Sequence, residues 1–199
     1  VVNALSEWLE VHVFKNGKEY MQRYERGKVM CPVKEVGSCS EDKHGTSVKF
    51  KPDPEIFEVT TFDYKTLKTR FRETAFLTKG ISIRLIDDRE EKHDKTFCYE
   101  GGIKEFVAYL NNASVPLYNS VIYCEGLKQN VFVEVAMQHT DAYTENIYTF
   151  VNNINTPEGG THLTGFRNAL TKTVNDYCRA NKLLKDSEDN LTGEDIREG

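Results

Sequence analysis

The chain has 199 residues, of which 39% are hydrophobic and 29% are charged, and its formal net charge is −5. This composition is typical of a globular chain with one large or two small cores, and the negative charge argues against a protein that coats nucleic acid by bulk charge alone. No stretch reaches the roughly 18 apolar residues of a membrane span, and nothing resembles a signal peptide. The five cysteines are scattered, odd in number and lack a CxxC pair, so a reduced cytoplasmic setting fits better than a zinc site or disulfide framework.

Both ends of the chain lead us to expect a piece of a longer protein. The chain begins at Val1 without an initiator Met, as though in the middle of a helix, and it closes on the polar stretch 193–199.

The first third of the chain predicts antiparallel strands. Asn16–Gly17 favours a type I′ hairpin turn, because both residues adopt positive φ at little cost, and Pro52 ends the last strand. The expected strands are residues 9–14, 19–26 and 45–50.

A helix is expected from Asp63, with Gly80 ending it in the manner of a C-cap. Residues 81–86 alternate as a strand, and the charge-rich stretch 87–95 predicts a solvated turn. The pattern restarts near Tyr99, where we place a domain boundary.

The second half predicts a further set of strands and helices. A short helix is expected after Gly102, with Ile103, Phe106, Val107 and Leu110 facing inward. The expected strands are residues 121–124, 131–137 and 147–151, with a turn that contains Gly126 between the first two. Strands interleaved with helices favour two-layer α/β sandwiches.

Residues 152–177 read as a turn that leads into a long amphipathic helix. Gly159–Gly160 breaks regular structure, and Thr161 is placed to cap the helix through its hydroxyl. One helical face is expected to carry Phe166, Leu170, Val174 and Tyr177.

The histidines give no catalytic or metal-binding spacing. His12 and His139 lie in strand patterns, where a hydrogen-bonded structural role is favoured over ligand binding. His162 lies at a helix N-terminus, which favours anions. The Gly-Gly-Thr-His turn is thus suited to a phosphate, a carboxylate or a partner's backbone, and a plain capping turn is an equal alternative.

An ordered series of segments resembles the B subunit of bacterial DNA gyrase and the closely related B-type subunit of topoisomerase IV, with gyrase favoured. The segments are residues 1–6, 45–48, 57–62, 71–73 with 76–77, 99–103, 152–154 with 158–162, 165–166 and 193–199. They span essentially the whole chain in order, which makes the series far more specific than any one segment.

This resemblance implies an α+β fold built from two domains. Residues 1–97 would form the C-terminal half of an ATP-binding domain of the gyrase/Hsp90/histidine-kinase/MutL type. Residues 98–199 would form a transducer domain, which resembles the second domain of a small ribosomal protein. The family's catalytic Glu and Mg²⁺-binding Asn would lie upstream, and the Lys of its Gln-Thr-Lys loop downstream, so no catalytic residue and no bound ATP or Mg²⁺ is expected in this chain alone.

The resemblance also implies a role for several residues. Thr46 would help hold adenine through a water molecule, Val48 would form an apolar wall, and Lys15 would lie at the lip of the nucleotide pocket. Arg167 and Lys172 are a hypothesis for the cavity that receives DNA. The residues matching a structural coupling motif of the transducer are Thr161, His162, Gly165 and Phe166.

The function implied for the full protein is ATP-driven passage of double-stranded DNA with negative supercoiling. Its partners would be the A protein of gyrase, in a heterotetramer of two A and two B subunits, and a second copy of the B protein that dimerises on ATP binding. A non-enzymatic α/β binding module for a protein or nucleic acid is the competing hypothesis from the residues alone.

Overall fold

The computed structural model describes residues 1–199, which form two compact units, Val1–Asp63 and Tyr64–Gly199. The mixture of helices and antiparallel sheets confirms the α+β class. The two units divide before the first long helix, at residues 63–64. The domain boundary predicted at residues 97–98 refers to the domains of longer, related proteins, and it stays a prediction. No helix in the chain is both long and apolar enough to cross a membrane.

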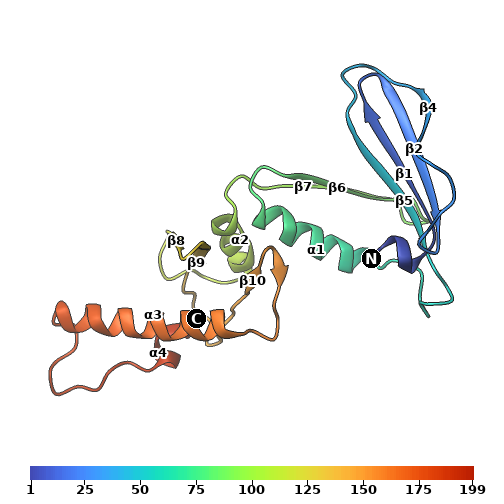
Figure 1. Cartoon of the computed structure of the whole chain (residues 1–199). Coiled ribbons are helices and arrows are strands. Elements are labelled where there is room, and N and C mark those ends of the chain that lie inside the picture. The colour runs from blue at the N-terminus through green and yellow to red at the C-terminus, as the bar shows by residue number, and fades with distance from the viewer. The chain divides into compact units, whose positions relative to one another are not determined.

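The first unit is an antiparallel sheet in the order β3-β2-β1-β5, with β4 also paired to β2 (Figure 1). The φ angles of Asn16 and Gly17 are 53° and 73°, so the predicted type I′ turn between β1 and β2 is confirmed. The first residues of the chain, which the sequence led us to expect inside a helix, form only one short 3-10 turn. The elements are η1 (Asn3–Leu5), β1 (Ser6–Lys15), β2 (Lys18–Glu25), β3 (Lys28–Val29), β4 (Lys34–Ser38) and β5 (Gly45–Pro52).

A buried carboxylate closes one end of this sheet. The backbone N–H of Asp53 donates to the Leu5 carbonyl at 3.1 Å, which ties the end of β5 to η1. The Asp53 carboxylate accepts hydrogen bonds from Arg26 Nε at 2.7 Å and from the Glu55 N–H at 3.0 Å. The turn after β2 is therefore held to the end of β5.

The second unit begins with α1 (Tyr64–Leu77), which packs on the hairpin of β6 (Ser82–Asp87) and β7 (His93–Cys98). Gly80 has a positive φ of 77°, but it lies three residues beyond the end of α1 and its N–H donates to the Tyr99 carbonyl at 3.4 Å, so it belongs to the turn between α1 and β6 rather than forming the predicted C-cap. The predicted turn over 87–95 is too long, because the register pairs Asp87 with His93. His93 belongs to β7, where its ring stacks on Tyr64 with centroids 4.3 Å apart.

Stacked aromatic rings join α1 to α2 (Ile103–Leu110). The buried ring of Phe76 stacks on Tyr99 at 3.6 Å and on Phe106 at 4.9 Å between centroids. This packing explains why the compact unit starts at α1 rather than after β7. Leu110, predicted to face inward, is exposed, because the core contact of α2 is made by Phe106.

Two further hairpins follow a short 3-10 helix, η2 (Asn111–Ala113). The predicted turn at Gly126 is wrong: Gly126 pairs with Val133 inside the hairpin, and the chain turns at Gln129–Asn130, both with positive φ. The predicted strand over 147–151 shortens to two residues. The strands are β8 (Ile122–Lys128), β9 (Val131–Met137), β10 (Phe150–Val151) and β11 (Ile154–Asn155).

The chain ends with the long helix α3 (Thr161–Ala180) and the short helix α4 (Gly193–Arg197), which lies beside it (Figure 1). A capping box starts α4, since the Thr192 hydroxyl accepts the Asp195 N–H at 3.3 Å and the Asp195 carboxylate accepts the Thr192 N–H at 2.7 Å.

Candidate functional site

The three residues predicted for nucleotide binding lie on one face of the first unit's sheet. The register sets Thr46 opposite Val13 and Val48 opposite Val11, and directly opposed side chains in an antiparallel pair share a face. Lys15 follows Val13 by two positions on β1 and therefore projects from the same face.

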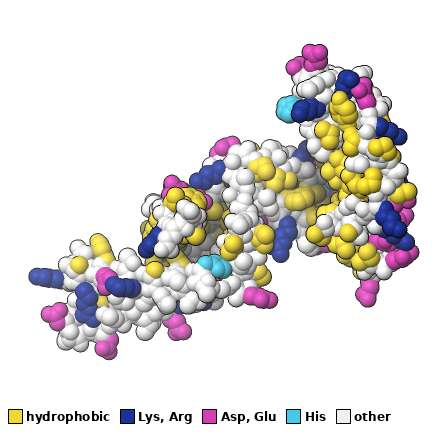
Figure 2. Space-filling view, in the orientation of Figure 1, with side chains coloured by type: hydrophobic (Ala, Val, Ile, Leu, Met, Phe, Trp, Pro, Cys, Tyr) yellow, Lys and Arg dark blue, Asp and Glu magenta, His cyan; other side chains and the backbone are white.

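Around Thr46 and Val48 this face is largely apolar and open to solvent. The side chains around Thr46 are valines and aromatic rings, and Val48 is 54% exposed. Figure 2 shows hydrophobic side chains gathered over this sheet. The paired strand β2 adds Tyr20, Gln22 and Lys18 to the same face. Such a surface, apolar with polar groups at its edges, suits a flat apolar ring with polar edges; the roles of the three predicted residues stay predictions.

The opposite face of the same sheet carries a polar cluster around His12. Its Nδ1 lies 2.7 Å from Glu19 Oε1 and its Nε2 lies 2.9 Å from Glu10 Oε1. Hydrogen bonds with Glu10 and then Glu19 raise the pKa of His12 above 6.5. The predicted structural role of this histidine is confirmed. His139 is also hydrogen-bonded, to the Tyr118 hydroxyl and to the Ile196 carbonyl.

The start of α3 differs from the predicted capping arrangement. Gly160 is the N-cap, with a φ of 147°, and no side chain caps the helix; Thr161 is its first residue. His162 Nε2 instead lies 3.1 Å from the hydroxyl of Thr156, which in turn lies 2.7 Å from the hydroxyl of Thr149. His162 thus links the start of α3 to the residues that flank the β10–β11 hairpin, Thr149 before β10 and Thr156 after β11.

The same hairpin also reaches the end of α1, since the Asn153 amide donates to the Thr78 hydroxyl at 3.1 Å. Of the other coupling-motif residues, Phe166 is half-buried and Gly165 faces open space. Of the residues predicted to share one face of α3, Tyr177 is exposed, and the polar residue Asn175 is buried on the last turns instead.

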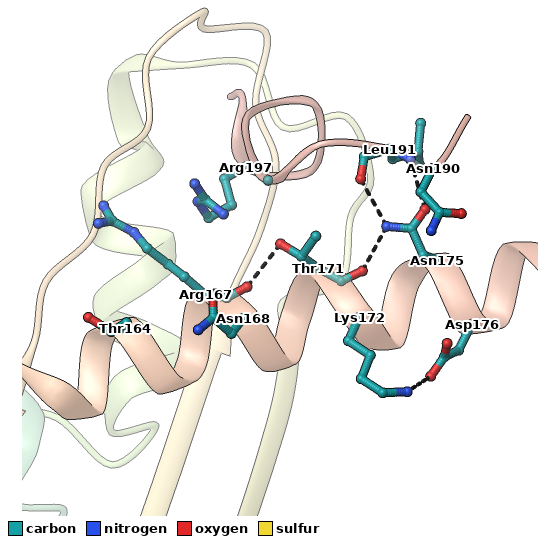
Figure 3. Close-up of a pocket in the computed structure, with 11 residues that line it drawn as sticks. Thr164, Arg167, Asn168, Thr171, Lys172, Asn175, Asp176, Asn190, Leu191 and Arg197 are labelled. Atoms are coloured by element: carbon teal, nitrogen blue, oxygen red, sulfur yellow. Dashed lines mark hydrogen bonds and ion pairs between the residues drawn. The ribbon is translucent and has the colours of Figure 1, made fainter. Parts of the chain in front are cut away.

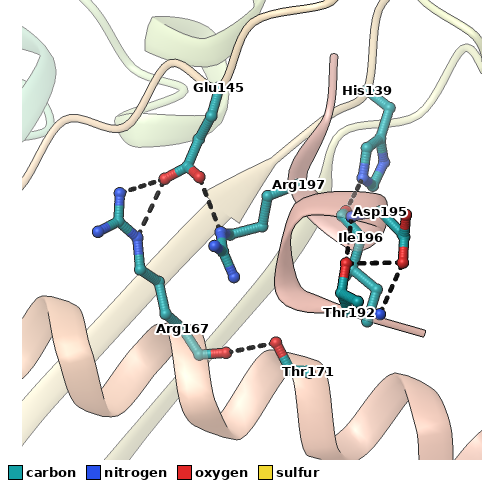
Figure 4. Close-up of polar contacts among 8 residues, drawn as sticks. All are labelled: His139, Glu145, Arg167, Thr171, Thr192, Asp195, Ile196 and Arg197. Carbon is teal, nitrogen blue, oxygen red and sulfur yellow. Dashed lines mark hydrogen bonds and ion pairs between the residues drawn. The ribbon is translucent and has the colours of Figure 1, made fainter. Parts of the chain in front are cut away.

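Arg167 is held by a carboxylate rather than projecting freely from α3. Glu145, from the loop before β10, accepts hydrogen bonds from Arg167 Nε at 3.0 Å on Oε1 and from Arg197 Nε at 2.8 Å on Oε2 (Figure 4). Burial raises the pKa of Glu145, but the hydrogen bonds from Arg197 and Arg167 outweigh it and hold that pKa below its usual range.

Between α3 and α4 lies a polar cleft of about 650 Å³ (Figure 3). Lys172 lies on its rim and is paired with Asp176, one turn further along α3. The structure therefore brings Arg167 and Lys172 to one cleft, together with Arg197. The other lining residues are Thr164, Asn168, Thr171, Asn175, Asp176, Asn190, Leu191 and Gly193.

Asn175 fixes the segment that forms the far wall of this cleft. Its Oδ1 accepts the Leu191 N–H at 2.8 Å, and its Nδ2 donates to the Leu191 carbonyl at 2.9 Å. Sequence reasoning missed Glu145, Asn175 and Arg197. The Thr-Gly-Glu-Asp sequence at 192–195 was a signal for α4, but no local pattern indicates that a loop carboxylate joins the two arginines.

Comparison with known proteins identifies related chains along the whole sequence. The family model described as DNA gyrase B matches residues 102–199. The B subunit of DNA gyrase from Clostridium acetobutylicum is 53% identical over all of this chain, which spans 31% of that protein. The corresponding proteins of Streptococcus pneumoniae and Bacillus cereus are each 52% identical over the whole chain, which spans 31% and 49% of them. The chain thus spans a third to a half of these relatives.

Solved structures agree with this comparison. The 43K ATPase domain of Thermus thermophilus gyrase B, solved with an aminocoumarin, has a TM-score of 0.83 and 38% identity, over 99% of this chain and 54% of that one. The ATP-binding domain of Francisella tularensis topoisomerase IV has a TM-score of 0.74 at 23% identity, over 96% of this chain and 51% of that one, and shares the fold.

Proposed function

Because this chain belongs to the DNA gyrase B family, we propose that it is part of the ATPase and transducer region that couples ATP binding and hydrolysis to DNA strand passage and negative supercoiling. The observation that carries the proposal is the relationship along the entire chain at about half identical residues. Residues 1–97 belong to the ATP-binding domain in this proposal, and residues 98–199 to the transducer.

The open apolar face of the first sheet supports a nucleotide-binding role for Thr46, Val48 and Lys15. A hydroxyl both donates and accepts hydrogen bonds, which suits a water-mediated contact with an adenine edge. The chain presents no group of three or more His, Cys, Asp or Glu side chains arranged to hold a metal ion, so no Mg²⁺ ligand is assigned to it. The chain alone is expected not to hydrolyse ATP.

The test is ATP hydrolysis by full-length gyrase B in complex with gyrase A. Thr46→Ala is expected to raise the KM for ATP about tenfold, which corresponds to the loss of roughly one hydrogen bond at the base. Ser47→Ala is the matched control, because Ser47 pairs with His12 and projects from the opposite face. Equal KM values for the two variants would contradict the assignment.

Coupling between nucleotide state and DNA is assigned to the turn of β10–β11 and the start of α3. Support comes from the bonds of His162 to Thr156 and of Asn153 to Thr78, which connect α3 and the hairpin to the end of α1. Partners in this proposal are gyrase A, a second copy of gyrase B and double-stranded DNA. The proposal also places the protein in the cytoplasm, which the five free cysteines support.

Arg167 and Lys172 are proposed to contact transported DNA. Reversing either charge would also set two carboxylates together, because Glu145 and Asp176 are their partners. The double variant Arg167→Gln, Lys172→Gln avoids this and is expected to lower DNA stimulation of ATP hydrolysis in the full enzyme. Unchanged stimulation would contradict the assignment.

The B-type protein of topoisomerase IV is the second candidate, because the ATP-binding domain of topoisomerase IV shares this fold. Supercoiling of relaxed plasmid by the full enzyme identifies gyrase, whereas decatenation without supercoiling identifies topoisomerase IV. A non-enzymatic binding module would show neither activity.

A further inference from the structure

Two arginines and a single carboxylate meet beside the cleft between α3 and α4. Arg167 donates hydrogen bonds to Glu145 through both Nε and Nη2, whereas Arg197 donates to it through Nε alone. One negative charge thus faces two positive charges, and Lys172 on the rim is balanced by Asp176 alone. The cleft has a net positive charge although the whole chain has a net charge of −5.

Arg197 has hydrogen-bonding capacity that the protein does not use. Its side chain is only 16% exposed, and Nε is the one nitrogen of the group that donates a hydrogen bond, to Glu145. A guanidinium group carries five N–H donors, so four of them remain for another acceptor. Arg197 and Arg167 both line the cleft (Figure 3).

Gly193 makes room for this guanidinium group. A Cβ at Gly193 would lie 2.5 Å from Nη1 and 3.2 Å from Nη2 of Arg197. Gly193 does not have positive φ, so its backbone does not require glycine. Because Gly193 has no side chain, the guanidinium group of Arg197 can occupy this space beside the cleft.

We propose that the α3–α4 cleft is a phosphate-binding site in which Arg197 is the principal ligand, Arg167 and the Asn168 amide are further donors, and Glu145 is the internal counter-ion that holds both arginines in place. The planar fork of an arginine matches two oxygens of a phosphate, and charge-assisted hydrogen bonds of this kind are strong. Glu145 orients the two forks, and a bound phosphate satisfies the terminal nitrogens that Glu145 leaves free.

The phosphate has two possible sources, a DNA backbone and a free inorganic phosphate. The first rests on the proposed function, and the second does not. The test is an NMR titration of the arginine Nε–Hε resonances of this chain, with inorganic phosphate in one arm and a short mixed-sequence DNA duplex in the other. Saturable shifts of the Arg197 and Arg167 resonances are expected.

Variants separate the site from general attraction of anions. Arg197→Gln is expected to weaken binding about tenfold, the value of a lost charge-assisted hydrogen bond. Gly193→Ala keeps every charge but displaces the Arg197 fork, and is expected to weaken binding about fivefold without lowering the unfolding temperature. Arg70→Gln, an exposed arginine of α1 paired with Glu73, is the charge-matched control.

Each outcome has a definite meaning. Shifts with both probes, or with phosphate alone, support a site that accepts free phosphate; shifts with the duplex alone support the site with a nucleic-acid backbone as its source. No saturable shift with either probe, or equal affinity for the parent chain, Gly193→Ala and Arg197→Gln, overturns the proposal. The measurement is independent of ATP hydrolysis, so this proposal and the ATPase role can fail separately.

Discussion

Arg26 donates a hydrogen bond through Nε to the carboxylate of Asp53 at 2.7 Å. Asp53 is only 1% exposed, and Arg26 lies in a turn with a positive φ of 46°. Positive φ is uncommon outside glycine and asparagine. The buried carboxylate holds Arg26 in this conformation and fixes the end of β5 to the turn after β2.

Asp53→Asn is expected to lower the unfolding temperature of the first unit by several degrees, because the amide loses the charge that binds Arg26. The Glu55 N–H and then the Arg26 guanidinium hold the pKa of Asp53 below 3.8. This stabilisation is therefore fully present above pH 3.8 and lost as the pH falls through the lower folded pKa. Thermal scans of both proteins from about pH 3 to pH 7 check it; parallel curves would contradict the linkage.

His12 is expected to give the sheet the opposite pH dependence. Its pKa is raised above 6.5 by Glu10 and Glu19, so its contribution is fully present below pH 6.5 and lost as the pH rises through the folded pKa. Urea unfolding midpoints of the parent chain should fall between about pH 6 and pH 9, and those of His12→Gln should change less. His44→Gln, at an exposed loop, is the control.

Asn175→Ala is expected to destabilise the second unit by about 1–3 kcal/mol, because it leaves the N–H and carbonyl of Leu191 without their partner in a buried setting. Asn168→Ala, on the same helix, should cost much less. Urea unfolding followed by circular dichroism measures both, and similar losses would show that Asn175 does not anchor the segment.

Phe76→Ala is expected to destabilise the second unit by about 3–5 kcal/mol, as for other buried aromatic truncations. Because Phe76 stacks on Tyr99 and Phe106, the loss should also let α1 and α2 unfold separately, which hydrogen exchange can detect. Phe132→Ala, on an exposed stretch of β9, is the comparison. Retained protection of both helices in Phe76→Ala would contradict the proposed link.

Local signals located most elements but not all turns. The Asn-Gly pair at 16–17 specifies its hairpin because both residues accept positive φ, and Gly80 accepts the positive φ of the turn between α1 and β6 for the same reason. The β8–β9 turn was misplaced at Gly126, because Gln129 takes positive φ without being a residue type that favours it. Cross-strand pairing, rather than local preference, fixes that turn.

The candidate site was predictable only in part. Alternation along a strand is enough to place Lys15, Thr46 and Val48 on one face once the strands are paired, and the family resemblance selected those residues. The roles of Glu145 and Arg197 were not predictable, because the two residues are 52 positions apart and meet through packing of a loop and α4 on α3.

The sequence by itself determined the α+β class, the family and most strands and helices, because these follow from period, turn chemistry and an ordered series of matching segments. Tertiary structure alone decided where the compact units divide, which residues cap α3 and how its arginines are used. Those features depend on contacts between distant parts of the chain, such as Phe76 with Phe106 and Glu145 with Arg197, and no local pattern encodes such a contact.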